Sequence, residues 1–85
     1  MKTEEIVITS PSGIHARPAG ELVKAAGKYE STITLSKNGK DANAKRLIAI
    51  LGLAAKQNET VTITVDGSDE EAAFAEVKEI IANAH

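Results

Sequence analysis

Residues 32–43 have the sequence TITLSKNGKDAN, which predicts a β-hairpin. Polar and apolar side chains alternate over residues 32–36, and this alternation places Ile33 and Leu35 on the inner face of a strand. The dipeptide Asn38-Gly39 follows, and it favours the tight two-residue turn that joins antiparallel strands. We therefore expect a short strand over residues 40–43 that pairs back onto the first strand.

Residues 4–9 and 60–65 also predict strands. In both, apolar side chains occupy alternate positions, as in a sheet with one buried face. The inward-facing residues are Ile6, Ile8, Val61, Ile63 and Val65. Turn-forming residues bound these strands at positions 10–13, at Gln57-Asn58, where Asn58 favours a left-handed backbone, and at Asp66-Gly67.

Helices are predicted between these strands and at the end of the chain. Residues 16–27 carry apolar side chains at helical spacing, and Gly27 is a natural stop. The predicted buried face of this helix consists of Ala19, Leu22, Val23 and Ala26. Residues 47–53 form a compact run that is too apolar for an ordinary exposed helix. We expect part of this run to be an exposed docking surface.

The last helix is predicted to end near Ala82. Ser68 and Glu71 have the serine-to-glutamate spacing of a capping box, which marks a helix start. The buried face is expected to consist of Ala73, Val77 and either Ile80 or Ile81, with Phe74 beside it.

The predicted order is strand, helix, strand, strand, helix, strand, helix (βαββαβα), in one domain over residues 1–85. Alternating strands give a sheet with one apolar face, which the helices must cover. The expected fold is an α/β (α+β) open-faced sandwich. Alternation does not fix the strand order, and a ferredoxin-like arrangement has a similar pattern.

The composition argues against several kinds of site. Cysteine is absent, and the only histidines are His15 and His85, so we expect neither a disulfide nor a metal site, and no cofactor. No stretch approaches the roughly 20 apolar residues of a membrane span, and nothing resembles a signal peptide. We therefore expect a cytoplasmic protein without membrane insertion.

Charge is distributed unevenly along the chain. Residues 15–56 contain eight basic and three acidic residues, whereas residues 57–85 contain one basic and seven acidic residues. A basic surface can bind nucleic acid, but Tyr29 and Phe74 are the only aromatic residues, too few for base stacking. An acidic protein partner fits better. Ordinary solvated faces are the alternative.

Residues 13–20, GIHARPAG, carry the candidate chemistry. With His15 as the N-cap, the free N–H groups of Ala16 and Arg17 lie at the positive end of the helix dipole and favour an anion. Pro18 suits the first helical turn. The Arg17 guanidinium can hold phosphate oxygens, and the same positive field keeps the imidazole neutral and nucleophilic.

This motif, the chain length and the element order resemble the HPr family, the histidine-containing phosphocarrier proteins of the bacterial sugar phosphotransferase system. Residues 43–45, 51–53 and 57–58 extend the similarity. The resemblance implies four antiparallel strands with three helices on one face. It also implies that Enzyme I phosphorylates His15 with phosphate from phosphoenolpyruvate, and that IIA domains of sugar permeases receive the phosphate. The protein would be a stoichiometric carrier, not an enzyme, and we expect a monomer.

By position, the resemblance makes Arg17 the charge partner of His15 and implies a hydrogen bond from Ser12 near the imidazole. Ser12 and the free N–H group of Ala16 are expected to support the phosphate and its loop. The residue pattern itself predicts the docking surface. Leu47, Ile48 and Leu51 are expected to form an exposed patch beside His15. The other expected docking residues are Gly20, Lys24, Lys45 and Arg46.

One departure from the family concerns regulation. Many Gram-positive members have a serine after the lysine that matches Lys45, and a dedicated kinase phosphorylates it. Here that position is Arg46, and no serine or threonine lies between Lys40 and Lys56. We therefore expect a constitutive carrier. A related repression paralogue lacks the histidine, so His15 argues against that identity. A nitrogen-type relay, or a regulatory module that binds proteins through the histidine, remains the alternative.

Overall fold

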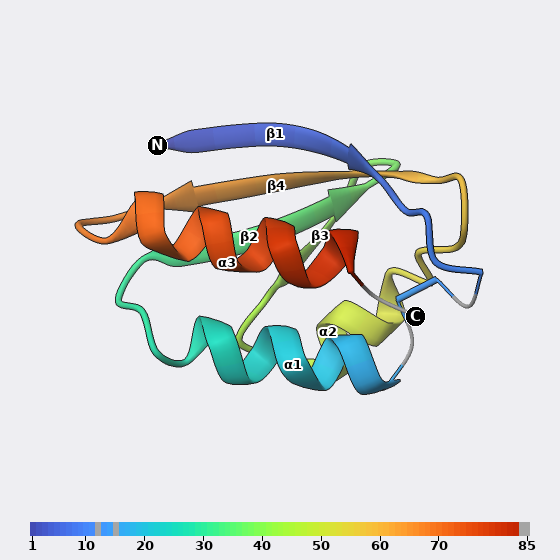
Figure 1. Cartoon of the computed structure of the whole chain (residues 1–85), viewed down its shortest axis with the longest axis horizontal. Helices are drawn as coiled ribbons and strands as arrows, with labels where there is room; N and C mark the ends of the chain where they lie inside the picture. The colour runs from blue at the N-terminus through green and yellow to red at the C-terminus, as the bar shows by residue number, and fades with distance from the viewer. Residues whose placement is uncertain (12, 15, 84–85) are drawn as a thin grey trace.

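The computed structural model describes residues 1–11, 13–14 and 16–83. In chain order the elements are β1 (Lys2–Val7), α1 (Ala16–Ala26), β2 (Thr32–Lys37), β3 (Lys40–Asn43), α2 (Leu47–Gly52), β4 (Thr60–Asp66) and α3 (Glu70–Ala82). The strands form one antiparallel sheet in the order β1-β4-β2-β3. The helices cover one face of this sheet (Figure 1), so the predicted open-faced sandwich is confirmed.

The predicted hairpin forms as expected. Lys37 pairs with Lys40, which leaves Asn38 and Gly39 as a two-residue turn. Both turn residues have positive φ angles, 51° and 83°, as the tight hairpin turn requires. This local geometry fixes the pairing register of β2 and β3.

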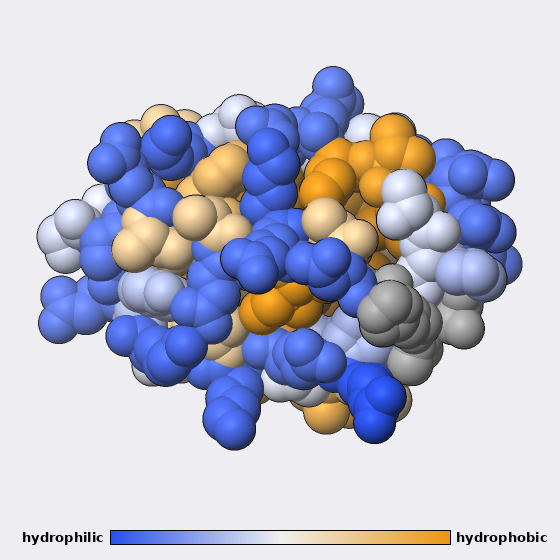
Figure 2. Space-filling view, in the orientation of Figure 1, coloured by the Kyte–Doolittle hydropathy of each residue, from blue (hydrophilic) through white to orange (hydrophobic). Residues whose placement is uncertain are grey.

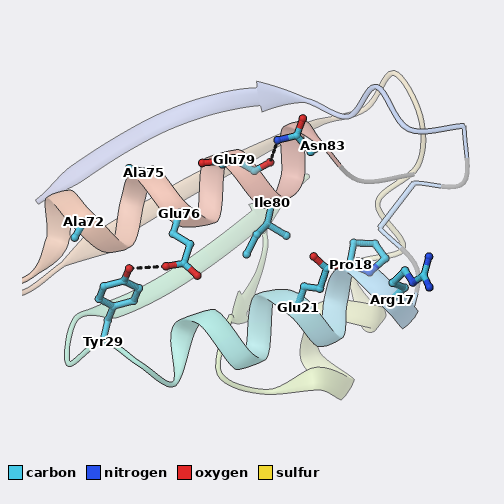
Figure 3. Close-up of a pocket in the computed structure, with 10 residues that line it drawn as sticks. All are labelled: Arg17, Pro18, Glu21, Tyr29, Ala72, Ala75, Glu76, Glu79, Ile80 and Asn83. Carbon is cyan, nitrogen blue, oxygen red and sulfur yellow. Dashed lines mark hydrogen bonds between the residues drawn. The ribbon is translucent and has the colours of Figure 1, made fainter.

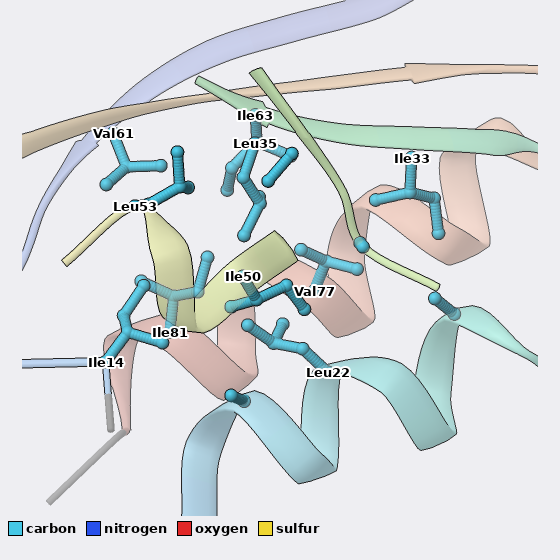
Figure 4. Close-up of a cluster of buried hydrophobic side chains, with 14 of the residues drawn as sticks. Ile14, Leu22, Ile33, Leu35, Ile50, Leu53, Val61, Ile63, Val77 and Ile81 are labelled. Atoms are coloured by element: carbon cyan, nitrogen blue, oxygen red, sulfur yellow. The ribbon is translucent and has the colours of Figure 1, made fainter. Parts of the chain in front are cut away.

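The core lies between the sheet and the three helices. Ile33, Leu35 and the three inward-facing residues of β4 have no solvent exposure. Leu22 of α1, Ile50 of α2 and Val77 of α3 meet them from the helical side (Figure 4). Each helix therefore contributes to one continuous apolar cluster.

Some details differ from the sequence prediction. The first strand begins earlier and ends at Val7, so the buried residue Ile8 lies just beyond it. Ile8 instead bonds with the loop before β4: its N–H donates to the Glu59 carbonyl at 2.9 Å and its carbonyl accepts from Asn58 at 2.7 Å. On α1, Val23 is only partly buried, whereas Ala25 is buried. These differences arise from tertiary packing.

The capping box predicted at Ser68 and Glu71 is wrong. The N-cap of α3 is Asp69, and its side chain makes no capping bond. The Glu70 carboxylate instead accepts a hydrogen bond from the N–H of Gly67, three residues before it, at 3.3 Å. The carboxylate of Asp69 accepts hydrogen bonds from residues 30 and 31, across the molecule. A long-range partner thus competes successfully with the local cap.

No helix within the described part of the chain is both long enough and apolar enough to cross a membrane.

Candidate functional site

The candidate site lies where the loop before α1 meets the loop before β4. The Ile14 N–H donates to the Ala55 carbonyl at 2.9 Å, and the Gln57 side chain donates to the Thr9 carbonyl at 3.2 Å. Gly13 has φ +67°, and a Cβ atom there would lie 2.3 Å from the Ala55 oxygen. Only glycine permits this close approach in this conformation. The two loops therefore hold residues 13 and 14 in a defined position.

Buried residues flank the predicted phosphoryl acceptor. Ile14 is 5% exposed and points into the core beside Ile81 (Figure 4), and Pro18 is buried in the first turn of α1. Between these anchors, Ala16 and Arg17 are exposed. His15 and Ser12 lie outside the described residues. The anchored neighbours leave Ala16 and Arg17, the first two residues of an 11-residue helix, exposed at the helix end that favours an anion.

Arg17 stands at one end of a groove of about 720 Å³ between α1 and α3. In Figure 3 its guanidinium points away from the groove, and it forms no ion pair with any described residue. Hydrophilic side chains cover most of this face, with hydrophobic surface visible between the helices (Figure 2). Arg17 therefore remains available for an anion from outside.

Charges are paired at the other end of this groove. Glu76 accepts from the Lys28 ammonium at 2.7 Å and from the Tyr29 hydroxyl at 2.6 Å. These two bonds hold the pKa of Glu76 below its usual value, and they raise the pKa values of Lys28 and Tyr29. This part of the acidic α3 is therefore neutralised by the basic α1 segment.

The structure brings part of the predicted docking set together on α2. Leu47 is 41% exposed and Ile48 is 80% exposed, so both side chains are open to a partner. Leu51 is partly buried and packs against the core. Arg46 is the exposed N-cap of α2 and forms no ion pair within the described chain.

The remaining docking candidates are more dispersed. Gly20 is exposed on α1, with open space around it. Lys45 donates to the Tyr29 carbonyl at 3.1 Å and is thereby tied to the loop that follows α1. Lys24 lies on the flank of α1 that faces α3, in a shallow groove with Glu21. Lys24 therefore lies on α1 itself, whereas Lys45 lies beside the loop that follows it.

No cluster of metal-binding side chains occurs among residues 1–11, 13–14 and 16–83.

Residues 2–83 match the protein family described as the PTS HPr component phosphorylation site. The chain belongs to the HPr family. It is 43% identical over 74 residues to the phosphocarrier protein HPr of Lysinibacillus sphaericus, covering 87% of this chain and 84% of that protein. It is 35% identical over 83 residues to HPr of Xylella fastidiosa (strain 9a5c), covering 98% and 93%.

Solved HPr structures have the same fold. HPr from Thermoanaerobacter tengcongensis aligns with a TM-score of 0.90 at 37% identity, over 95% of this chain and 91% of that one. The relatives are phosphocarriers of the phosphotransferase system, and this supports a phosphocarrier role. A dimer of HPr from T. tengcongensis aligns with a TM-score of 0.75 over 95% and 93% of the two chains, also at 37% identity, so dimers do occur among such proteins.

Three residues next to the site could not be found from the sequence. Ala55 supplies the carbonyl that holds Ile14, and Ala54 has a left-handed backbone with φ 51°. Lys37 extends from the end of β2 to the Ala54 carbonyl. None of the three has a local sequence signal, because alanine carries no chemistry and a lysine beside Asn38-Gly39 is typical of an ordinary hairpin.

Proposed function

We propose that His15 accepts a phosphoryl group from Enzyme I and passes it to IIA domains of sugar permeases in the cytoplasm. The observation that carries this proposal is that α1 begins with Ala16, Arg17 and Pro18, directly after His15 in the sequence, in a chain of the HPr family. In uptake, a neutral imidazole nitrogen of His15 attacks phosphorus, and the new N–P bond forms as the bond from phosphorus to Enzyme I breaks. In onward transfer, a nucleophile of the IIA domain attacks the same phosphorus, and the N–P bond breaks to leave the imidazole neutral again.

The helix start and Arg17 supply the electrostatic part of this mechanism. The N–H groups at the start of a helix favour negative charge, by about 0.3–1 kcal/mol at surface sites. The Arg17 guanidinium would stabilise the charge on the phosphoryl oxygens during transfer. No described carboxylate forms an ion pair with Arg17. The guanidinium can therefore bind the phosphoryl oxygens without first breaking an existing ion pair.

The test is incubation with Enzyme I and phosphoenolpyruvate, followed by mass spectrometry. A gain of one acid-labile, base-stable phosphate is expected on the unmodified protein, and none on His15→Ala. Arg17→Ala should fold normally and take up phosphate much more slowly. Acid-labile labelling of His15→Ala would refute the assignment. A protein without uptake would be a binding module instead.

We also propose that the exposed apolar patch of Leu47 and Ile48, with Leu51 at its base, docks these partners. Apolar contacts would supply affinity, while Arg46 and the neighbouring lysines would mainly raise the association rate. The support is the exposure of both patch side chains on a helix that packs beside α1. Chemical-shift mapping with Enzyme I should locate the contact on α2 and the start of α1.

We further propose that no serine kinase regulates this carrier. Arg46 replaces the regulatory serine and keeps this surface basic, where a phosphoserine would add negative charge. The protein and its Arg46→Ser variant can be offered to the kinase with ATP. Acid-stable phosphate is expected on the variant only. Such phosphate on the unmodified protein would mean that regulation has moved to another residue.

The carrier is proposed to act as a monomer. Sedimentation velocity at working concentrations should give a single species of one chain. A stable dimer would place this protein with the dimeric relatives instead.

A further inference from the structure

A single lysine anchors the loop that supports the candidate site. Lys37, the last residue of β2, donates to the Ala54 carbonyl at 3.0 Å and to the Glu59 carboxylate at 3.0 Å. Its side chain is only 12% exposed, and that of Glu59 is 35% exposed. Glu59 also accepts the Lys56 N–H at 2.7 Å. The pair therefore holds both ends of residues 54–59.

This loop has an unfavourable backbone that needs support. Ala54 and Asn58 both have left-handed φ angles, 51° and 71°, although neither is glycine. Alanine adopts this conformation reluctantly because its Cβ atom approaches the backbone. A charge-assisted hydrogen bond from the Lys37 ammonium to the carbonyl of Ala54 stabilises Ala54 in this left-handed conformation.

The anchored loop is also the one that holds the chain before His15. Ala55, next to Ala54, accepts the Ile14 N–H at 2.9 Å, and Asn58 donates to the Ile8 carbonyl at 2.7 Å. Gly13 packs directly against the Ala55 carbonyl. A shift of residues 54–55 would therefore move residues 13–14, which immediately precede the acceptor.

We infer that the Lys37–Glu59 pair positions the phosphoryl-accepting histidine through the backbone of Ala54 and Ala55. This inference rests on the proposed function of His15. Both side chains act through the loop, so Lys37 and Glu59 are positioning residues and take no part in the chemistry. Misplacement of a reacting group by about 1 Å can slow a reaction about a hundredfold.

The test replaces Lys37 by methionine in the full chain, which keeps the apolar part of the side chain and removes the ammonium. Two results are expected: the maximal rate of phosphoryl transfer from Enzyme I falls about tenfold, and the Ile14 amide exchanges with solvent several times faster. The Enzyme I concentration for half-maximal rate should stay unchanged, because the partner contacts lie elsewhere. Lys37→Arg should restore most of the rate.

The matched control is Lys78→Met. Lys78 forms a more exposed ion pair with Glu4, at 2.6 Å, which joins α3 to β1 rather than to this loop. Its loss should leave transfer and Ile14 exchange unchanged. Equal transfer rates and equal Ile14 exchange in the two variants would overturn the inference. So would a loss of rate in Lys37→Met that merely follows a fall in its melting temperature.

Two further measurements test the inference if Lys37→Met does not fold or if the proposed function of His15 is wrong. If Lys37→Met does not fold, Glu59→Gln removes the ion pair while keeping a hydrogen-bond acceptor, and a smaller decrease in rate is expected. If the unmodified protein takes up no phosphate, the proposed function of His15 fails. The exchange rate of the Ile14 amide then still decides whether Lys37 anchors the loop.

Discussion

The helical layer has one end where α3 begins and another where α1 begins (Figure 1). The polar side chains at these two ends differ in whether they are paired within the protein. At the end where α3 begins, the Asp69 carboxylate accepts bonds from the Glu30 N–H at 2.9 Å, the Ser31 N–H at 3.0 Å and the Ser31 hydroxyl. We call this cluster the Ser31–Asp69 junction. At the end where α1 begins, Arg17 is exposed and has no ion-pair partner among the described residues.

This difference indicates where stability and function reside. Ser31 is fully buried and its hydroxyl is satisfied, so the junction contributes to folding. At the site end, the close approach of Gly13 to the Ala55 backbone fixes the two loops. The side chains of Arg17, Leu47 and Ile48 are exposed to solvent there. Apart from the backbone contact at Gly13, which should affect both properties, side-chain substitutions at the two ends should therefore separate the free energy of unfolding from phosphate uptake.

Gly13→Ala should have the largest effect, because it both strains a left-handed residue and collides with Ala55. We expect a loss of about 2–4 kcal/mol in the free energy of unfolding, measured by urea denaturation, together with slower phosphate uptake. Gly39→Ala is the control, since Gly39 also has a positive φ but open space around it. Equal losses in the two variants would show that the close approach of the loops adds nothing.

Ser31→Ala should come next, with a loss of about 1.5–3 kcal/mol, because a buried hydrogen bond to a carboxylate disappears. Ser36→Ala is the matched control, since the Ser36 hydroxyl donates to Asp41 at 2.6 Å on the exposed surface, and its loss should stay within about 0.5 kcal/mol. Phosphate uptake by the folded Ser31→Ala protein should be normal. Impaired uptake would break the separation between the two ends.

Acid should weaken the same junction. The Ser31 hydroxyl, and then the Glu30 N–H, hold the pKa of Asp69 below its usual value. This contribution is fully present above the unfolded-state pKa of about 3.9, and it is lost as the pH falls through the lower folded-state pKa. Asp69→Asn should therefore flatten the decline in melting temperature below about pH 4. Asp41→Asn is the control, and identical pH profiles for the two variants would contradict this account.

Ile48→Ser should change stability least, within about 0.5 kcal/mol, because the side chain is 80% exposed. Binding to Enzyme I should nevertheless weaken about tenfold, as for an apolar residue central to an interface. Val7→Ser is the matched control: Val7 is 50% exposed on β1, away from α2. Titration calorimetry with both variants measures the difference, and equal affinities would remove Ile48 from the docking surface.

The sequence by itself determined the local structure. Alternation in residues 32–36 and 60–65 placed Ile33, Leu35 and their counterparts inward, because side chains of a strand point to opposite faces in turn. Asn38-Gly39 fixed the hairpin, since those residues tolerate positive φ. The HPr-like motif could also be recognised in the sequence because it is local: a helix start, a proline and an arginine lie within a few residues of His15.

Only the tertiary structure decided which distant segments meet. Alternation shows which side chains of a strand face the core, but it does not show which strands are neighbours in the sheet. The order β1-β4-β2-β3 therefore depends on tertiary packing. The wrong cap on α3 has the same origin, because Asp69 binds Ser31 across the molecule. The anchoring of Ile14 by Ala55, and of Ala54 by Lys37, joins residues with no local signal. Such contacts depend on loop closure through the whole fold, which a local pattern does not encode.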